Sequence, residues 1–243
     1  MGQPVAGVDG CRGGRLVVLV DEQGHPISSS QVRLCTKFED ILALSPAPAV
    51  IAADIPIGLL DCPQRGGRAC DQQTRRLLGR RASSVFSPPS RIVLEAREYA
   101  DAWKHGLRIQ AFGILPKIRE VDRLMRPELQ GLVHESHPEL AFTALAGHPM
   151  RFNKKTVRGR HERLRALERD ASQLFRRIGR TLSDALNGLS RRHVAPDDLV
   201  DASVLAWRFG SPTGRPNKSL PIRRLIERDF AWRFGIEMAQ CWY

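Results

Sequence analysis

The sequence has few cysteines and no long apolar run, and each shortage excludes a class of protein. Its five cysteines, at positions 11, 35, 62, 70 and 241, include no Cys-x-x-Cys pair. This odd, unclustered set predicts reduced thiols, without a disulfide framework or a structural zinc site. No stretch of 18 or more apolar residues is present to span a bilayer, and Met1 to Pro4 lead into a strand rather than a signal segment. We therefore expect a soluble, cytoplasmic protein with no membrane partner.

Acidic residues are also scarce relative to basic ones. The chain has 26 Asp and Glu against 38 Lys and Arg, which gives a net charge of +12. Most of the basic residues are arginines, whose guanidinium groups can bind two phosphate oxygens at once. Nucleic acid, either DNA or RNA, is therefore one expected partner. The alternative is a basic surface that is merely solvated, and net charge does not separate the two.

The most informative stretch that is present runs from Val5 to Gly14. An apolar run ends there in Asp9 and then breaks into glycines. This pattern is typical of a buried strand that delivers one charged group to the edge of a sheet. Residues 50–54 repeat the design, because four apolar residues lead to Asp54. With 42% hydrophobic residues in 243, the chain is long enough to bury a full core.

The first 54 residues predict the element order β-β-β-α-β. Strands are expected from Val5, over 15–20 and over 26–34, followed by a helix over 38–44 and a strand that ends at Asp54. A crossover through a helix makes the fourth strand parallel to an earlier one, most simply the first. That placement brings Asp9 and Asp54 to the same edge of the sheet.

The remaining chain predicts mainly helices. Residues 55–90 are irregular and basic, and are either a substrate loop or an ordinary surface excursion. Helices are expected over 92–105, 115–125, 138–145 and from Pro196 through Trp207, with a short strand at 132–135 that ends in Glu135. We expect one domain over 1–210 with a helical insertion at about 60–128. Residues 211–243 are expected to form an extension packed on the same domain.

The acids at strand ends and on apolar helix faces form the candidate active site. The predicted catalytic residues are Asp9, Asp54, Glu135 and Asp201, with Asp198 and Glu139 beside them. Several acids at one sheet edge need a neutralising cation, and Mg²⁺ or Mn²⁺ prefers oxygen ligands. Asp9, Asp54, Asp198 and Asp201 are the predicted metal ligands. Two ions roughly 3.5 to 4 Å apart would then support phosphodiester hydrolysis.

Several of these acids also have a structural alternative. Asp9 before Gly10 fits a turn, Asp198 fits a helix cap, and Glu139 fits the start of a helix, where its charge complements the dipole. Asp201 resists such an explanation, because Val204 and Leu205 share its helix face and make it a partly buried acid that needs a partner.

Basic residues supply candidate phosphate contacts. The predicted contacts are Arg12, Arg81, Lys154 and Lys155. The basic run over 154–165 follows the third acid-ended strand, which favours phosphate binding, although a solvated face remains the alternative. From Leu164 onward the apolar residues follow helical spacing, so we expect the arginines of this segment on the exposed face.

A series of motifs in chain order resembles that of an uncharacterised prokaryotic family. The motifs are Gly7-Val8-Asp9-Gly10-Cys11-Arg12-Gly13-Gly14, Asp54-Ile55-Pro56-Ile57-Gly58-Leu59, Ser83-Ser84-Val85-Phe86, Leu115-Pro116-Lys117-Ile118-Arg119-Glu120-Val121-Asp122, Glu135-Ser136-His137-Pro138-Glu139, Lys154-Lys155-Thr156 and Asp197-Asp198-Leu199-Val200-Asp201-Ala202. Members carry a domain of unknown function and are described as predicted nucleases of the ribonuclease H fold. Two departures are Arg15, where the resemblance leads us to expect Trp, and the region after Gly210.

The resemblance implies a ribonuclease H-like α/β domain with a mixed five-stranded sheet of order 3-2-1-4-5. It places Asp9 and Asp54 at the acids of the first and fourth strands, Asp201 at the acid of the late helix, and Glu135 at the end of the fifth strand. Fold does not fix function, so the activity stays an expectation.

Three functions are therefore considered. The first is a nuclease that depends on Mg²⁺ or Mn²⁺. The second is a phosphotransferase or ATPase of the related actin-like fold, with residues 10–14 as a phosphate loop; it would need a homodimer to complete its cleft. The third is a catalytically inactive nucleic-acid-binding protein.

Overall fold

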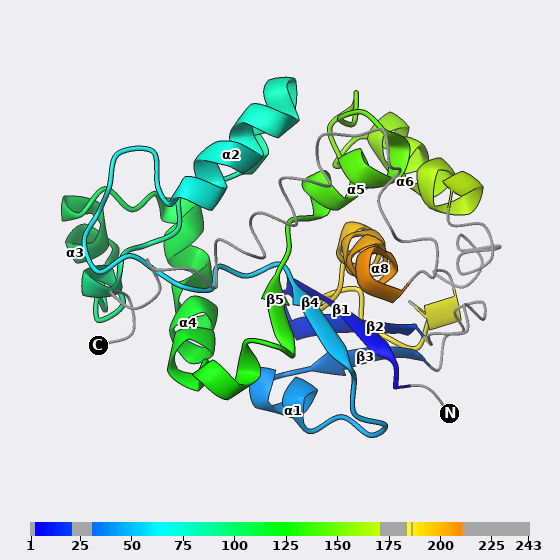
Figure 1. Cartoon of the computed structure of the whole chain (residues 1–243), viewed down its shortest axis with the longest axis horizontal. Coiled ribbons are helices and arrows are strands. Elements are labelled where there is room, and N and C mark those ends of the chain that lie inside the picture. Colours follow the sequence, from blue (N-terminus) through cyan, green and yellow to red (C-terminus); the bar gives the residue numbers. More distant parts are fainter. Residues whose placement is uncertain (1–2, 21–30, 171–183, 186, 211–243) are drawn as a thin grey trace. The chain divides into compact units, whose positions relative to one another are not determined.

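The structure, a computed structural model, describes residues 3–20, 31–170, 184–185 and 187–210 (Figure 1). The described residues fall into two compact units. The sheet unit contains those up to Ile55 and from Arg126 onward, and the helical unit contains residues 56–125. Most of the predicted insertion at about 60–128 falls in the helical unit. The predicted extension over 211–243 lies outside the described residues.

The sheet unit is built on a mixed five-stranded sheet of order β3-β2-β1-β4-β5. Its strands are β1 (Val5–Cys11), β2 (Gly14–Val20), β3 (Val32–Cys35), β4 (Val50–Ala53) and β5 (Val133–Glu135). β2 is antiparallel to both β1 and β3, whereas β4 is parallel to β1 and β5 is parallel to β4. The predicted α/β class and the strand order 3-2-1-4-5 are confirmed.

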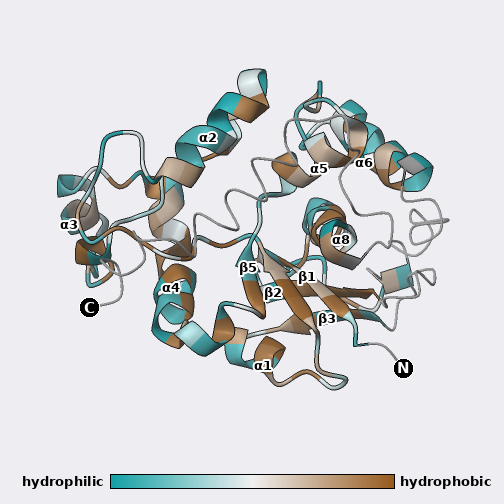
Figure 2. Cartoon of the chain, in the orientation of Figure 1, coloured by the Kyte–Doolittle hydropathy of each residue, from teal (hydrophilic) through white to brown (hydrophobic). Residues whose placement is uncertain are grey.

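Helices cover both faces of this sheet, which explains why its central strands are apolar on both sides (Figures 1 and 2). Helix α1 (Phe38–Leu42) contacts β3 on one face. Helix α8 (Pro196–Gly210) crosses the other face and packs on β1, β2 and β4. Helices α5 (Pro138–Ala146) and α6 (Val157–Asp170) pack on α8 in turn, and a short helix η4 (Pro127–Leu129) precedes β5.

A glycine in β1 sets the distance between α8 and the sheet. A Cβ atom at Gly7 would collide with the carbonyl oxygen of Ala202 and with the backbone nitrogen of Ala206. The backbone of α8 therefore lies directly on the strand, with no side chain between them. Gly7 and Asp9 lie on the same face of β1, because alternate residues of a strand share a face. The close contact thus brings α8 to the face from which Asp9 projects.

The helical unit contains α2 (Ala69–Leu78), α3 (Tyr99–Lys104) and α4 (Ile109–Leu124), with the short helices η2 (Gly79–Ser84) and η3 (Arg91–Val93). The continuous helix predicted over 92–105 is wrong, because the chain leaves helical structure between η3 and α3. Arg119 accounts for the break: its Nε donates to the Leu94 carbonyl (2.5 Å) and its Nη2 to that of Ala96 (3.2 Å). These carbonyls are satisfied by a side chain from α4 instead of a following helical turn.

Among the described residues, no helix combines the length and the apolar character needed to cross a bilayer. The four cysteines within them, Cys11, Cys35, Cys62 and Cys70, carry free thiols. Strand β3 begins later than predicted, at Val32, and residues 26–30 of the predicted strand lie outside the described residues.

Substituting Gly7→Ala should lower the free energy of unfolding by about 1 to 3 kcal/mol, the usual cost of overpacking a core. The added methyl group meets backbone atoms, which cannot rotate away as a side chain would. Urea denaturation measures the change. Gly131→Ala is the matched control, since a Cβ atom there meets nothing within 4 Å. Equal stability of the two variants would show that α8 does not depend on this contact.

Candidate active site

Three carboxylates from different elements meet where β1 and β4 run beneath α8. Asp9 belongs to β1, Asp54 follows the last residue of β4, and Asp201 belongs to α8. Asp9 and Asp201 are buried, with 6% and 1% of their surface exposed, and Asp54 is half-buried. The Asp54 N–H donates to the Val8 carbonyl (2.9 Å), which holds the end of β4 beside β1. The structure thus brings together the two strand-end acids and the helix acid singled out in the sequence.

The carboxylates of this acidic cluster, defined as Asp9, Asp54 and Asp201, perturb one another strongly. Burial raises the pKa of Asp9 well above its usual value, and the charges of Asp201 and Asp54 raise it further. Burial likewise raises the pKa of Asp54, against the opposing effects of His137, Lys154 and a hydrogen bond with the Asp9 carboxyl group. The pKa of Asp201 rises to about 6, mainly through burial and partly through Asp54. The cluster therefore holds protons more tightly than exposed carboxylates do.

Lys154 supplies positive charge to the cluster. Its Nζ atom lies 2.5 Å from Oδ2 of Asp201, and it reaches the site from the loop between α5 and α6. Burial works against the charged lysine, but Asp201, Asp9 and Asp54 outweigh that effect and raise its pKa. The sequence predicts Lys154 as a phosphate contact, and the structure places it on the acids. Lys155, predicted with it, is exposed, and its backbone N–H donates to Oδ1 of Asn153 (3.0 Å).

A buried arginine holds the loop that carries Lys154. Arg163 of α6 is 1% exposed and forms an ion pair with Glu139 of α5. Its Nη1 donates to the carbonyls of Phe152 (3.2 Å) and Gly159 (2.9 Å), and its guanidinium carbon lies 5.6 Å from the centre of the Phe142 ring. Arg163 thus ties α5, α6 and the loop together, and its charge also lowers the pKa of Asp201.

This ion pair corrects two predictions. Not all the arginines of the basic helix lie on its exposed face, because Arg163 is buried. Glu139, predicted to lie beside the acids, pairs with Arg163 instead. Sequence reasoning missed Arg163, although its spacing from the buried Ala166 and Leu167 gives a usable signal, since residues three and four apart share a helix face.

The register of β5 separates Glu135 from the face that α8 covers. Ala52 pairs with His134, and Ala53 pairs with Glu135. His134 therefore lies on the α8 side, where its ring stacks on Phe209 at 5.4 Å between centroids. Glu135 shares the opposite side with Ala53. Its charge still raises the pKa of Asp54, but less than burial does.

The other predicted site residues have varied surroundings. Asp198 accepts the Ala195 N–H at Oδ2 (2.7 Å), which is the capping role that the sequence left open. Its charge also contributes to raising the pKa of Asp9. Arg12 is exposed in the turn between β1 and β2, and Arg81 belongs to η2 of the helical unit.

Whether the acidic cluster suits a metal ion depends on its chemistry and its arrangement. Its carboxylate oxygens are the ligands that Mg²⁺ and Mn²⁺ prefer, and the mutual increase of their pKa values is a repulsion that a dication would relieve. In the described residues, no group of three or more His, Cys, Asp or Glu side chains is arranged to hold a metal ion. The donor set thus fits the ion chemically, while Lys154 provides positive charge at Asp201.

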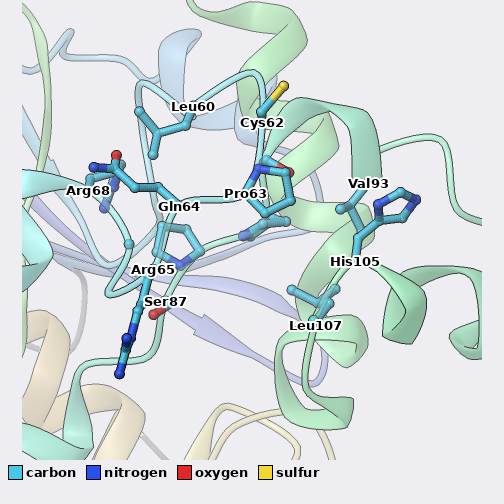
Figure 3. Close-up of a pocket in the computed structure, with 15 residues that line it drawn as sticks. Leu60, Cys62, Pro63, Gln64, Arg65, Arg68, Ser87, Val93, His105 and Leu107 are labelled. Atoms are coloured by element: carbon cyan, nitrogen blue, oxygen red, sulfur yellow. The ribbon is translucent and has the colours of Figure 1, made fainter.

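The helical unit has a cavity of its own, of about 310 Å³ (Figure 3). Arg65, Arg68, Ser87 and His105 contribute polar groups to its wall. The guanidinium of Arg68 already binds Asp71 (2.7 Å) and the Ile57 carbonyl (2.7 Å). No Asp or Glu is among the described residues that line this cavity, so it lacks the carboxylates of the sheet unit.

Comparison with known proteins gives one match. A family model described as "Protein of unknown function (DUF429)" matches residues 7–209. Searches of curated proteins and of solved structures give no significant match. The matched range contains all three carboxylates of the acidic cluster, as well as Gly7 and Lys154. The chain therefore belongs to the DUF429 family of proteins of unknown function.

Proposed function

We propose that this protein is a metal-dependent nuclease that hydrolyses phosphodiester bonds at the acidic cluster. One observation carries the proposal: Asp9, Asp54 and Asp201 converge from two neighbouring strands and one helix at the edge of a 3-2-1-4-5 sheet. Such a cluster is costly for folding, because desolvation penalises each ionised carboxylate and the three repel one another. Perturbed groups of this kind are enriched at functional sites.

Asp9, Asp54 and Asp201 would hold Mg²⁺ or Mn²⁺, which would supply a water of lowered pKa and polarise the scissile phosphate. Lys154, whose pKa is raised, stays protonated at neutral pH and would act as a fixed positive charge toward a phosphate rather than as a base. Glu135 and Asp198 would act on the cluster through their charges, since both raise the pKa of one of its carboxyl groups.

The glycine-rich turn offers little support for a phosphotransferase or ATPase. Such an enzyme would need free backbone N–H groups in residues 10–14 to cradle a phosphate. The Gly13 N–H instead donates to the His193 carbonyl (3.0 Å). A Cβ atom at Gly14, whose φ is 139°, would collide with the carbonyl oxygen of Cys35, so this glycine serves close packing. The turn therefore has a structural explanation as a hairpin.

Substituting Asp54→Asn should reduce metal-dependent cleavage at least about 100-fold. The change removes a charge that would help to hold the ion, and metal activation is worth several kcal/mol, with 1.36 kcal/mol per factor of ten. Cleavage of labelled single-stranded DNA, single-stranded RNA, duplexes and hybrids, with Mn²⁺ or with EDTA, measures the effect. Asp101→Asn is the control, because that aspartate is exposed and pairs with the exposed Lys104 of the same helix.

Undiminished cleavage by Asp54→Asn would refute the nuclease proposal for this cluster. Binding of nucleic acid by the wild type without cleavage of any substrate, with either metal, would favour the inactive nucleic-acid-binding protein.

The free energy of unfolding of the metal-free wild type should fall as the pH rises from about 4 to about 6. A carboxyl group whose pKa is higher in the folded state binds protons preferentially there, so its contribution to stability is complete at low pH and disappears above the folded pKa. For Asp201 the pKa rises from 3.8 to about 6. At 1.36 kcal/mol per pKa unit, this corresponds to about 3 kcal/mol. Urea denaturation across this pH range measures the change.

The Asp201→Asn variant separates this effect from that of other titrating groups. It should show a shallower fall over the same pH range, and it should gain stability relative to the wild type as the pH rises. Added Mn²⁺ should stabilise the wild type more at pH 7 than at pH 4, because protons compete with the metal. Identical pH profiles for wild type and variant would contradict the raised pKa of Asp201.

A further inference from the structure

A groove of about 450 Å³ lies on the sheet unit, along α6 and the loop before it. Most of its polar lining is basic, and we call it the arginine groove. Its basic residues are His148, Arg151, Arg158, His161, Arg165 and Arg169. All six are exposed. Three of them, Arg158, His161 and Arg165, belong to the basic run over 154–165 for which the sequence favours phosphate binding, whereas His148, Arg151 and Arg169 lie outside that run.

Helical spacing builds the groove. Arg158, His161, Arg165 and Arg169 follow one another at intervals of three or four residues, so they form one stripe along α6, a helix that is largely hydrophilic (Figure 2). The 11 helical steps from Arg158 to Arg169, at 1.5 Å each, span roughly 16 Å. That length matches about five nucleotides of a stacked strand, at the 3.4 Å rise that each strand has in a duplex.

The groove keeps most of its positive charge. Of the described residues that line it, Glu162 alone is acidic, against four arginines. Its carboxylate accepts the backbone N–H groups of Arg151 (2.9 Å) and Phe152 (3.0 Å), so it fixes the loop. Phe152 also lines the groove, and 41% of its surface is exposed. Exposed aromatic rings beside basic side chains are the usual platform for unpaired bases.

The same loop connects the groove with the acidic cluster. Arg151 and Phe152 line the groove, and two residues later Lys154 contacts Asp201. Gly159 lets the loop lie directly against α6, because a Cβ atom there would collide with the Asn153 carbonyl. The groove and the acidic cluster therefore share one loop as a common border.

We propose that the arginine groove binds the phosphodiester backbone of a single-stranded nucleic acid, with Phe152 stacked on one of its bases. A single strand is favoured over a duplex because only unpaired bases can stack on Phe152. The proposal that a strand binds depends only on the groove. The further step, cleavage of the bound strand, rests on the proposed nuclease function.

Fluorescence anisotropy with labelled 15-nucleotide single-stranded RNA and DNA, in EDTA so that no metal is present, tests the proposal. The variant Arg158→Gln/Arg165→Gln should bind at least about tenfold more weakly at 0.1 M salt. The slope of log K against log salt should become shallower by about 1.4, or 0.7 for each lost contact with a single strand. Phe152→Ala should weaken binding at least about fivefold and leave the slope unchanged.

The matched control is Arg126→Gln/Arg191→Gln, which removes the same charge from exposed positions that lie outside the basic run over 154–165 and do not line the groove. It should bind like the wild type, and urea denaturation should show that all variants are folded. Equal losses in the groove and control variants would overturn the proposal, since only net charge would then matter. Tighter binding of duplexes or of polyglutamate than of single strands would also overturn it.

Two results distinguish this proposal from the nuclease proposal. If the Arg158→Gln/Arg165→Gln variant loses binding while the wild type cleaves nothing, the groove is confirmed and the nuclease proposal fails. If this variant cleaves single strands with unchanged kcat and KM, the groove proposal fails and the nuclease proposal stands.

Discussion

The direct contact between α8 and β1 at Gly7 is the constraint on which the candidate site depends. No side chain separates the two backbones at this point. Asp201, the neighbour of Ala202 in α8, is therefore held close to the strand that carries Asp9. A larger residue at position 7 would push the helix outward and increase the distance between Asp201 and Asp9. The glycine therefore sets the proximity of the carboxylates, and with it the strength of their mutual repulsion. The packing of α8 on β1 at Gly7 thus also determines how strongly Asp9 and Asp201 interact.

The cost of gathering these carboxylates is offset in three ways. Protons remain on the cluster at a higher pH than usual, as the raised pKa values of Asp9 and Asp201 show. The Lys154 ammonium contacts Asp201 directly, and the buried Arg163 lowers the pKa of Asp201 from farther away. Under the nuclease proposal, a divalent cation would replace the protons and share the carboxylate oxygens. Lys154 and Arg163 belong to the chain and would remain as fixed positive charges near the cation.

Local patterns in the sequence predicted the β-β-β-α-β start, the placement of Asp9 beside Asp54, and Asp201 as a further buried acid, whereas the full strand order 3-2-1-4-5 was implied by the family resemblance. An apolar run that ends in an aspartate marks a strand end, and the crossover rule then places two such ends side by side. Asp201 followed from the apolar residues on its helix face. These inferences need only the spacing of apolar residues along strands and helices and the rules for connections between parallel strands.

Other features depend on contacts between distant residues, which no local pattern contains. Glu135 ends an apolar strand just as Asp54 does, but a shift of one residue in register decides which face it joins. The break before α3 depends on Arg119, which lies over 20 residues away. A basic residue in the sequence shows charge but not its partner, so Lys154 could not be distinguished from basic residues that face solvent, and helical spacing indicated the burial of Arg163 but not its pairing with Glu139.

The loop between α5 and α6 contains basic residues with different surroundings only a few positions apart: Arg151 lines the arginine groove, and Lys154 contacts Asp201. The Glu162 carboxylate and the Arg163 guanidinium fix its backbone from two sides, the first through N–H groups and the second through the Phe152 carbonyl. Residues of the loop thereby point both to the arginine groove and to the acidic cluster. A substitution in the arginine groove or in the acidic cluster that moved the backbone of this loop would therefore also alter the geometry of the other site. The arginine groove and the acidic cluster are thus joined through one loop, whose residues line the first and contact Asp201 of the second.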